Sequence, residues 1–308
     1  MKGLALSEAY YRAFGAAMIG TKFPAHRNRI AVGLAGLGSE CFGFDDALSR
    51  DHDWGPGFCM WLDGNDYNAI GVLLQKAYDA LPGFMGFHRR ESTWGQGRVG
   101  VLSTERFYAS FIGSPHPPET PGQWLTIPES GLAACTNGRV FGDPLDAFSS
   151  IRRQLLNHYP EDIRLKKIAA HCMTAAQSGQ YNYSRSLRRN ADYPAFQALA
   201  KFCEEVLALV FLLNRRYMPF YKWACRAASA LPLLGAELSE AVENLIRETE
   251  PREKEHRIES ICAKLIEALK EQDLSDSPSD FLLDHGPRVH SRIRDEKLKR
   301  LDIWWPGA

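Results

Sequence analysis

The stretch that decides the fold runs Gly38-Ser39-Glu40-Cys41-Phe42-Gly43, then a short loop, then Ser49-Arg50-Asp51-His52-Asp53. It follows an apolar segment, residues 29–37, that is predicted to be a buried strand. A Gly-Ser step after a strand makes a turn without Cβ crowding, and it offers a backbone N–H and a hydroxyl that suit a phosphate. We therefore predict that Gly38 and Ser39 contact the phosphates of a nucleotide.

The two aspartates that follow predict a metal site. In a strand, side chains two residues apart point to the same face, so Asp51 and Asp53 would face one way and His52 the other. Mg²⁺ is usually held by one or two carboxylates, with substrate phosphates and waters filling its coordination shell. Asp51 and Asp53 are therefore expected to be the metal ligands and the catalytic residues.

This combination of a Gly-Ser turn and an Asp-x-Asp strand resembles the signature of the polymerase-β-type nucleotidyltransferase superfamily. Within it, the chain is similar to an uncharacterised bacterial nucleotidyltransferase-like family related to kanamycin and lincosamide nucleotidyltransferases. Four further segments resemble that family: residues 124–129, 136–141, 178–183 and 217–223. The resemblance implies an α/β part, with a nucleotidyltransferase-type mixed β-sheet and flanking helices, followed by an all-α part, a C-terminal antiparallel helical bundle.

The first part of the chain is expected to alternate helices and strands. Apolar spacing predicts helices over residues 7–22 and 66–81. Strands are expected at 84–90 and 98–103, and Thr104 is expected to cap the helix that follows the second of them.

The rest of the chain has the apolar spacing of an antiparallel bundle. Five segments show it: 145–158, 161–178, 193–214, 219–230 and 238–268. We expect residues 1–145 to form the nucleotidyltransferase-like catalytic and nucleotide-binding domain and 146–272 the helical bundle domain. Residues 273–308 are expected to be a polar linker and a C-terminal helix near 287–301, and the nucleotide is expected between sheet and bundle.

Two segments of the bundle carry further candidate nucleotide-binding residues, both on the strength of the resemblance. The first follows Gly179, which is expected to break a helix, and comprises Gln180, Tyr181, Asn182 and Arg185. Aromatic rings can stack on a base there, and guanidinium groups match phosphate oxygens. The alternative is an ordinary connection with solvated arginines.

The second segment surrounds Lys222. Pro219 is expected to start a helix, which would place Lys222 in its first turn, where a lysine and free N–H groups suit a phosphate. The alternative is an aromatic core patch with a lysine that extends to solvent.

One departure from the superfamily pattern bears on catalysis. Active members generally carry a third carboxylate on a later strand, and Gly100 stands where that acid is expected. Glu105 and Glu129 are nearby in sequence and could replace it, but their spacing selects neither.

Composition narrows the function classes. Lys plus Arg and Asp plus Glu number 37 each, so net charge argues against nucleic acid or an anionic membrane as partner. The seven scattered cysteines form no Cys-x-x-Cys pair, which favours a reducing compartment. No apolar run approaches the roughly 20 residues of a membrane span, and the first residues do not resemble a signal peptide. A cytoplasmic protein is expected.

The leading hypothesis is a Mg²⁺- or Mn²⁺-dependent nucleotidyltransferase. ATP, or another NTP, would donate the nucleotidyl group, expected to be AMP, to an unknown acceptor on a small molecule or a protein. One alternative is a catalytically silent nucleotide-binding or toxin-neutralising protein. Another is an antibiotic-modifying nucleotidyltransferase.

Overall fold

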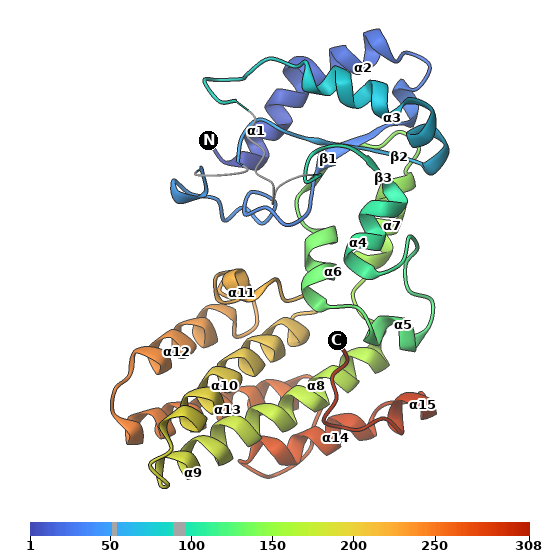
Figure 1. The fold of residues 1–308 in the computed structure, drawn as a ribbon. Helices are drawn as coiled ribbons and strands as arrows, with labels where there is room; N and C mark the ends of the chain where they lie inside the picture. Colours follow the sequence, from blue (N-terminus) through green and yellow to red (C-terminus); the bar gives the residue numbers. More distant parts are fainter. Residues whose placement is uncertain (51–53, 89–96) are drawn as a thin grey trace. The chain divides into compact units, whose positions relative to one another are not determined.

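The computed structural model describes residues 1–50, 54–88 and 97–308. The described chain divides into two compact units (Figure 1). The first comprises Met1–Pro118 and Gly131–Asn157, and the second comprises Glu119–Ser130 and His158–Ala308. No helix among the described residues is long and apolar enough to span a bilayer.

The first unit is built on a mixed four-stranded sheet, as predicted. Its strands are β1 (Ala31–Leu34), β2 (Cys59–Leu62), β3 (Gly100–Ser103) and β4 (Arg139–Gly142), in the spatial order β3-β2-β1-β4. β1 pairs antiparallel with β2 and β4, whereas β2 and β3 are parallel. Both β1 and β2 are buried along their whole length, which explains why they read as continuous apolar runs.

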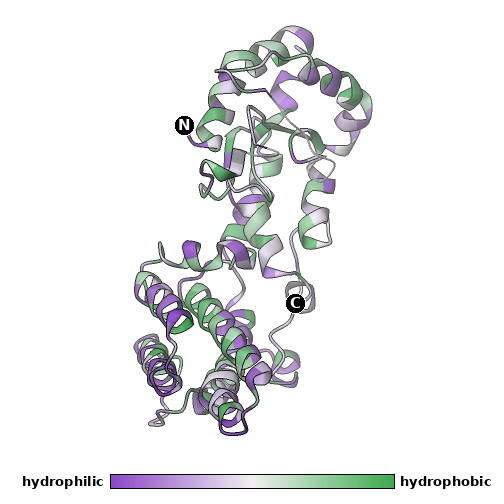
Figure 2. Ribbon diagram, turned by 60° about the vertical axis from the view of Figure 1, so that its left-hand side comes forward, coloured by the Kyte–Doolittle hydropathy of each residue, from purple (hydrophilic) through white to green (hydrophobic). Residues whose placement is uncertain are grey.

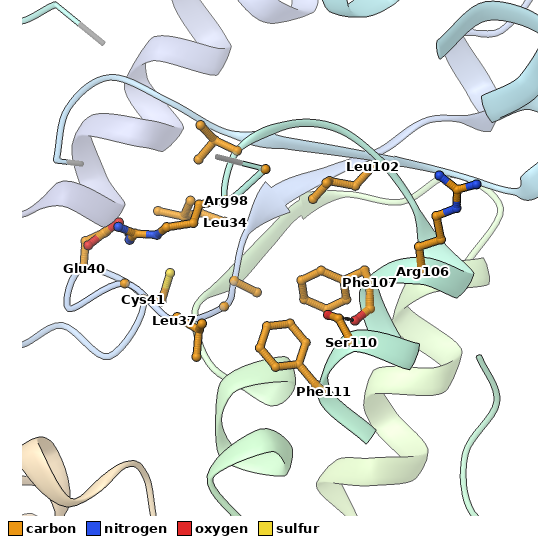
Figure 3. A pocket seen from close by; sticks show the side chains of 15 residues that line it. Leu34, Leu37, Glu40, Cys41, Arg98, Leu102, Arg106, Phe107, Ser110 and Phe111 are labelled. Carbon is orange, nitrogen blue, oxygen red and sulfur yellow. Dashed lines mark hydrogen bonds and ion pairs between the residues drawn. The ribbon is translucent and has the colours of Figure 1, made fainter. Parts of the chain in front are cut away.

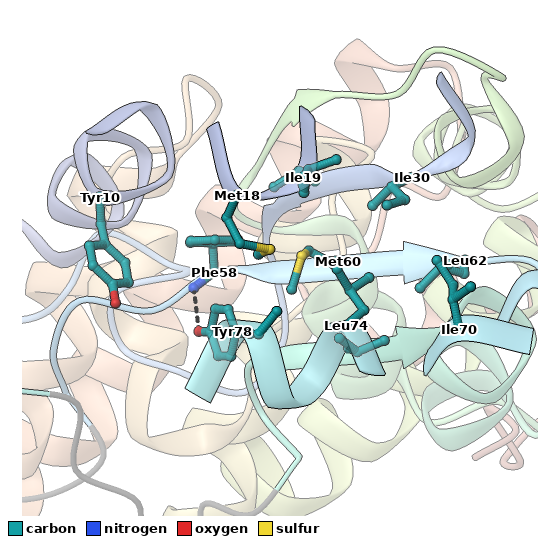
Figure 4. Close-up of a cluster of buried hydrophobic side chains, with 13 residues drawn as sticks. Tyr10, Met18, Ile19, Ile30, Phe58, Met60, Leu62, Ile70, Leu74 and Tyr78 are labelled. Atoms are coloured by element: carbon teal, nitrogen blue, oxygen red, sulfur yellow. Dashed lines mark hydrogen bonds between the residues drawn. The ribbon is translucent and has the colours of Figure 1, made fainter. Parts of the chain in front are cut away.

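Helices pack against this sheet. They are α1 (Gly3–Tyr10), a π-helical segment (Tyr11–Gly15), α2 (Ala16–Lys22), α3 (Gly64–Asp79), α4 (Thr104–Ile112), α6 (Glu129–Thr136) and α7 (Ala147–Leu156), with 3₁₀ turns at Arg27–Arg29 and Leu48–Arg50. Figure 4 shows Met60 and Leu62 of β2 facing Leu74 of α3 in one hydrophobic cluster. The hydroxyl of Tyr78 accepts a hydrogen bond from the Phe58 N–H at 3.0 Å, which fixes α3 to the start of β2.

Two local predictions in this unit are wrong. Residues 84–88, the described part of the strand expected at 84–90, hold only an isolated bridge between Phe84 and Phe87. The cap of α4 is Ser103 rather than Thr104, since the Ser103 hydroxyl accepts the hydrogen bond from the Arg106 N–H. A hydroxyl residue stands at both positions, so the sequence alone could not separate them.

The second unit is helical, and its helices carry separate polar and apolar faces (Figure 2). They are α5 (Pro121–Leu125), α8 (Glu161–Ala176), a π-helical segment (Gln177–Tyr183), α9 (Ser184–Leu187), α10 (Asp192–Leu213), α11 (Tyr221–Ala228), α12 (Gly235–Arg247), α13 (Pro251–Glu271), a 3₁₀ turn (Leu282–Asp284), α14 (His285–Ser291) and α15 (Glu296–Lys299). Two short helices thus replace the single helix expected near 287–301. Residues 273–280 form no helix or strand, but Ser275 and Ser277 are buried.

Gly179 does not break a helix, contrary to the prediction. The chain continues from α8 through the π-helical segment, and Gly179 lies in it against Phe202 of α10. A Cβ atom at Gly179 would lie 2.4 Å from Cδ2 of the Phe202 ring. Glycine is therefore required here by the close approach of α10 and not by the turn of the chain.

We predict that Gly179→Ala lowers the free energy of unfolding by about 1–3 kcal/mol, because the buried Phe202 ring has to move. Gly122→Ala is the control in the same unit, since no heavy atom lies within 4 Å of its added Cβ. Urea unfolding of both variants measures the effect. Equal stabilities of the two variants would show that the ring contact imposes no constraint.

A second prediction concerns His158, which is 5% exposed and stacks on Tyr217 with ring centroids 4.8 Å apart. Burial lowers the pKa of His158 to about 3. Between the unfolded-state pKa of about 6.5 and this value, the unfolded chain binds a proton that the folded chain does not, so stability falls as pH falls. His158→Phe should remove this contribution, about 1.4 kcal/mol per pH unit in that range. Urea unfolding between pH 7 and pH 4 measures it, and parallel curves for the two proteins would contradict it.

Candidate functional site

The loop after β1 is anchored by Asn137. The Asn137 side chain accepts a hydrogen bond from the Gly36 N–H at 2.9 Å and donates one to the Gly36 carbonyl at 2.7 Å. The neighbouring Gly138 has a φ of +63°, and a Cβ there would lie 1.9 Å from the Leu34 carbonyl oxygen. Only glycine fits this position, so Asn137 and Gly138 hold the loop against the end of β1.

Gly38 and Ser39 form the predicted turn directly after this anchor. Their carbonyl oxygens accept hydrogen bonds from the N–H groups of Cys41 at 3.0 Å and Phe44 at 2.9 Å. Among the described residues, no acceptor bonds the N–H of Gly38 or Ser39. No described residue thus occupies these two donors, and their contact with phosphates stays a prediction.

An ion pair that the sequence analysis missed covers this turn. Nη2 of Arg98 lies 2.7 Å from Oε1 of Glu40, and the side chain of Glu40 is 11% exposed. A Cβ atom at Gly38 would lie 2.2 Å from Nη2 of Arg98 and 2.3 Å from Oε1 of Glu40. Gly38 therefore makes room for the ion pair as well as for the turn.

A cavity of about 420 Å³ lies between this loop and α4 (Figure 3). Besides the loop, it is lined by Leu34 of β1, Leu102 of β3, and Phe107 and Phe111 of α4. Its charged lining residues are Glu40, Arg98 and Arg106. The cavity falls within the size range of small-molecule sites, and it combines apolar walls with a few charged groups at one loop.

The residue of β3 that lines this cavity is Leu102 rather than an acid. Gly100 has a φ of +98°, and a Cβ there would lie 2.6 Å from Oε1 of Gln75, which accepts the Val101 N–H at 2.8 Å. An acidic side chain at position 100 would therefore meet α3. The glycine is explained by local backbone geometry.

Of the remaining acidic candidates, Glu105 is described by the structure and bonds groups outside the cavity. Asp51 and Asp53 lie outside the described residues. Oε1 of Glu105 accepts the Gly64 N–H at 3.1 Å and Oε2 accepts the Ser103 hydroxyl at 2.5 Å. Burial raises the pKa of Glu105, but these hydrogen bonds and one from its own backbone outweigh that effect and lower the pKa. Elsewhere in the described chain, no three His, Cys, Asp or Glu side chains gather as a metal site.

Four predicted nucleotide-binding residues lie on one turn in the second unit. Nε2 of Gln180 donates to Oε2 of Glu259 at 2.6 Å, and its Oε1 accepts the Leu282 N–H at 2.9 Å. Arg185 donates from Nη1 to the Tyr181 hydroxyl at 2.8 Å, with its guanidinium carbon 4.7 Å from that ring's centroid. Tyr181, Asn182 and Arg185 are exposed, whereas the amide of Gln180 bonds within the unit.

Lys222 lies apart from this turn, on α11. The helix begins at Tyr221, so Lys222 is in its first turn as predicted. Nζ of Lys222 lies 5.0 Å from the centroid of the Trp223 ring, and the lysine is exposed. That Lys222 binds a phosphate stays a prediction.

The pair Glu40–Arg98 is predicted to stabilise the loop. Arg98→Met should lower the free energy of unfolding by about 1–3 kcal/mol, because it leaves a largely buried carboxylate without its partner. Adding Glu40→Gln to Arg98→Met should then lower the free energy of unfolding by less than Glu40→Gln does in the parent protein. A double-mutant cycle from urea unfolding should give a coupling of about 1–3 kcal/mol. Additivity of the two changes would show that the pair does not hold the loop.

Comparison with known proteins gives limited matches. Residues 124–224, about a third of the chain, match a family described as a domain of unknown function (DUF4037). No curated protein matches the sequence. A solved structure of a nucleotidyltransferase-like protein from Exiguobacterium sibiricum 255-15 is similar with a TM-score of 0.37 and 13% identity, over 94% of this chain and 80% of that chain.

Proposed function

We propose that the protein is a Mg²⁺- or Mn²⁺-dependent nucleotidyltransferase that moves AMP from ATP to a hydroxyl or phosphate of a small molecule or protein. One observation carries the proposal. Gly38, whose N–H has no acceptor among the described residues, lines a cavity that also holds Arg98 and Arg106. The chain then runs from this turn to the paired aspartates Asp51 and Asp53.

The described groups suit the phosphate end of a nucleotide. The Gly38 N–H can donate to a phosphate oxygen, and Arg98 and Arg106 bring two guanidinium groups to the lining of the same cavity. The Ser39 hydroxyl donates to Oε2 of Glu40 at 3.5 Å. In the proposed reaction, an acceptor oxygen forms a bond to the α-phosphorus and loses its proton to a base. The bond to the β-phosphate oxygen breaks, and pyrophosphate leaves.

The metal would have to be held by Asp51 and Asp53. Glu40 is the only described carboxylate that lines the cavity, and it is already bound to Arg98. A divalent cation held by two carboxylates supplies charge neutralisation for a triphosphate when it is bound.

A second candidate is a nucleotide-binding protein without turnover, and the residue of β3 that lines the cavity favours it. Nucleotidyl transfer needs a base that takes the acceptor proton, and Leu102 supplies none at the cavity. Such a protein would bind ATP as the enzyme would, and could act as a toxin-neutralising partner.

Binding is tested first. ATP with Mg²⁺ should raise the melting temperature, because only the folded state has the site; at 100 times Kd the stabilisation is about 2.7 kcal/mol. The double variant Asp51→Asn, Asp53→Asn should lose this shift. The variant Asp192→Asn, Asp276→Asn removes the same charge at exposed positions of the second unit and should keep it. A shift that survives in the first variant would refute the assignment of the two aspartates.

Turnover then separates the two candidates. ATP labelled at the α-phosphate should label an acceptor in a cell extract and release pyrophosphate, whereas ATP labelled at the γ-phosphate should not label it. Kanamycin and lincomycin as added acceptors test the antibiotic-modifying alternative. ATP binding without label transfer would overturn the enzyme in favour of the silent binder.

A further inference from the structure

A second cavity, of about 1,090 Å³, lies within the second unit. Helices α8, α10, α11 and α12 contribute to its walls, with residues 128–130 and 306–308. Much of the lining is apolar, including Phe196, Leu199, Leu207, Ala208, Ala224 and Val242. It is as large as the upper end of drug-sized ligand pockets, so it has room for a molecule of several rings.

Two side chains linked through Glu205, those of His171 and Lys201, form part of its polar lining with that carboxylate. Nδ1 of His171 lies 2.5 Å from Oε2 of Glu205, and Nζ of Lys201 lies 2.8 Å from Oε1 of Glu205. In the neutral form of an imidazole whose Nδ1 donates to a carboxylate, the lone pair lies on Nε2. No hydrogen bond to Nε2 of His171 exists among the described residues. This nitrogen is therefore an available acceptor.

A third polar group is Glu129, whose Oε1 accepts the Met218 N–H at 3.0 Å. Burial raises the pKa of Glu129, and the nearby Lys167 and His171 partly oppose that shift. Its Oε2 has no hydrogen-bond partner among the described residues. Nζ of Lys167 instead donates to the Ala308 oxygen at 3.2 Å. Glu129 thus offers a second available acceptor.

The formal charges of the side chains that line the cavity are balanced, with four carboxylates (Glu129, Glu204, Glu205 and Glu243) and four cations (Lys167, Lys201, Arg247 and Lys254). Lys201 bonds Glu205, and Lys167 lies close enough to Glu129 to favour its ionised form. An added anion would meet two carboxylates, and an added cation would meet Lys167 and Lys201, so either would disturb the balance. A ligand group that is uncharged and donates a hydrogen bond fits these two acceptors without disturbing the charge balance of the lining.

We propose that this cavity binds an uncharged, largely apolar small molecule, whose hydroxyl group donates a hydrogen bond to Glu129 or His171. The apolar body lies along Leu199, Ala208 and Val242. Phe196, 65% exposed, and Tyr221, 79% exposed, provide aromatic surface at the rim. The proposal does not depend on the nucleotide site, because every lining residue belongs to the second unit.

Four pyrene derivatives test it in the full-length protein by fluorescence titration: 1-pyrenemethanol, 1-methylpyrene, 1-pyrenecarboxylate and 1-pyrenemethylammonium. The alcohol should bind about tenfold more tightly than 1-methylpyrene, which corresponds to one hydrogen bond of about 1.4 kcal/mol. Both charged derivatives should bind more weakly than the alcohol. Equal binding of the alcohol and 1-methylpyrene, tighter binding of a charged derivative, or no binding of any probe would overturn the proposal.

Variants of the cavity residues test where the hydroxyl of the ligand binds. Glu129→Leu with His171→Phe should remove the preference for the alcohol and keep the affinity for 1-methylpyrene, whereas Glu240→Gln, at an exposed position outside the cavity, should keep both. Ala208→Trp fills the cavity and should abolish binding of both probes. Phe196→Arg, at an exposed rim position, should weaken both severalfold without a buried change, in case Ala208→Trp fails to fold. Unchanged binding in Phe196→Arg or in a folded Ala208→Trp would place the probes elsewhere and overturn the proposal.

Discussion

The pairing of the Asn137 side chain with the backbone of Gly36 is the contact on which the candidate nucleotide site depends. It satisfies both polar groups of a buried glycine at the point where β1 ends and the loop begins. Without it, those groups would be buried without partners at a cost of about 1–3 kcal/mol each. The contact also couples the loop to β4, because Arg139 pairs with Leu34 at the end of β1 and the Gly138 N–H donates to the Cys41 carbonyl at 2.9 Å. The position of the Gly38-Ser39 turn is therefore set by a residue about a hundred positions later in the chain.

The sequence predicted the parts of the first unit whose cause is local. The Gly-Ser turn, the buried strand before it and the helix expected at 66–81 all follow from nearby residues, and all are present, the helix as α3 with Asp63 as its N-cap. The Glu40–Arg98 pair and the role of Asn137 could not be predicted, because each joins segments far apart in the chain. Gly100 shows the same limit. Its φ of +98° and the approach of Gln75 on α3 both disfavour a side chain at this position, and comparison with a superfamily pattern could reveal neither.

In the second unit, the helices expected at 161–178, 193–214 and 219–230 are present near those bounds because their apolar spacing is regular, whereas 238–268 is divided into α12 and α13, with the break just before Pro251. The errors arose where a residue type has two uses. Gly179 could end a helix or admit a neighbouring ring, and the structure shows the second use. The exposed Tyr181 and Arg185 were predicted to contact a nucleotide. In the structure these two side chains contact one another. A cation over an aromatic ring holds both side chains in place, and such a pair is equally compatible with a stacking surface for a ligand.

Helix α8 shows why periodicity could not reveal the larger cavity. Arg164, Lys166 and Lys167 would be placed on the surface by any amphipathic template, yet all three are buried. Carbonyl groups of other segments make this possible: Nε of Arg164 donates to the Leu212 oxygen at 2.8 Å, and Nζ of Lys166 donates to the oxygens of Asp302 at 2.6 Å and Trp305 at 2.5 Å.

Hydrogen bonds from buried cations to carbonyl oxygens offset part of the cost of removing charge from water, but not all of it. The pKa of Lys166 is accordingly lowered by burial to about 8. Lys166 and Lys167 bind the backbone of residues 302, 305 and 308 to α8, and residues 306–308 line the cavity beside Lys167. The polar residues that make α8 look solvent-exposed in the sequence are thus the ones that attach the end of the chain to it. The cavity wall is formed by tertiary contacts that a one-dimensional pattern does not contain.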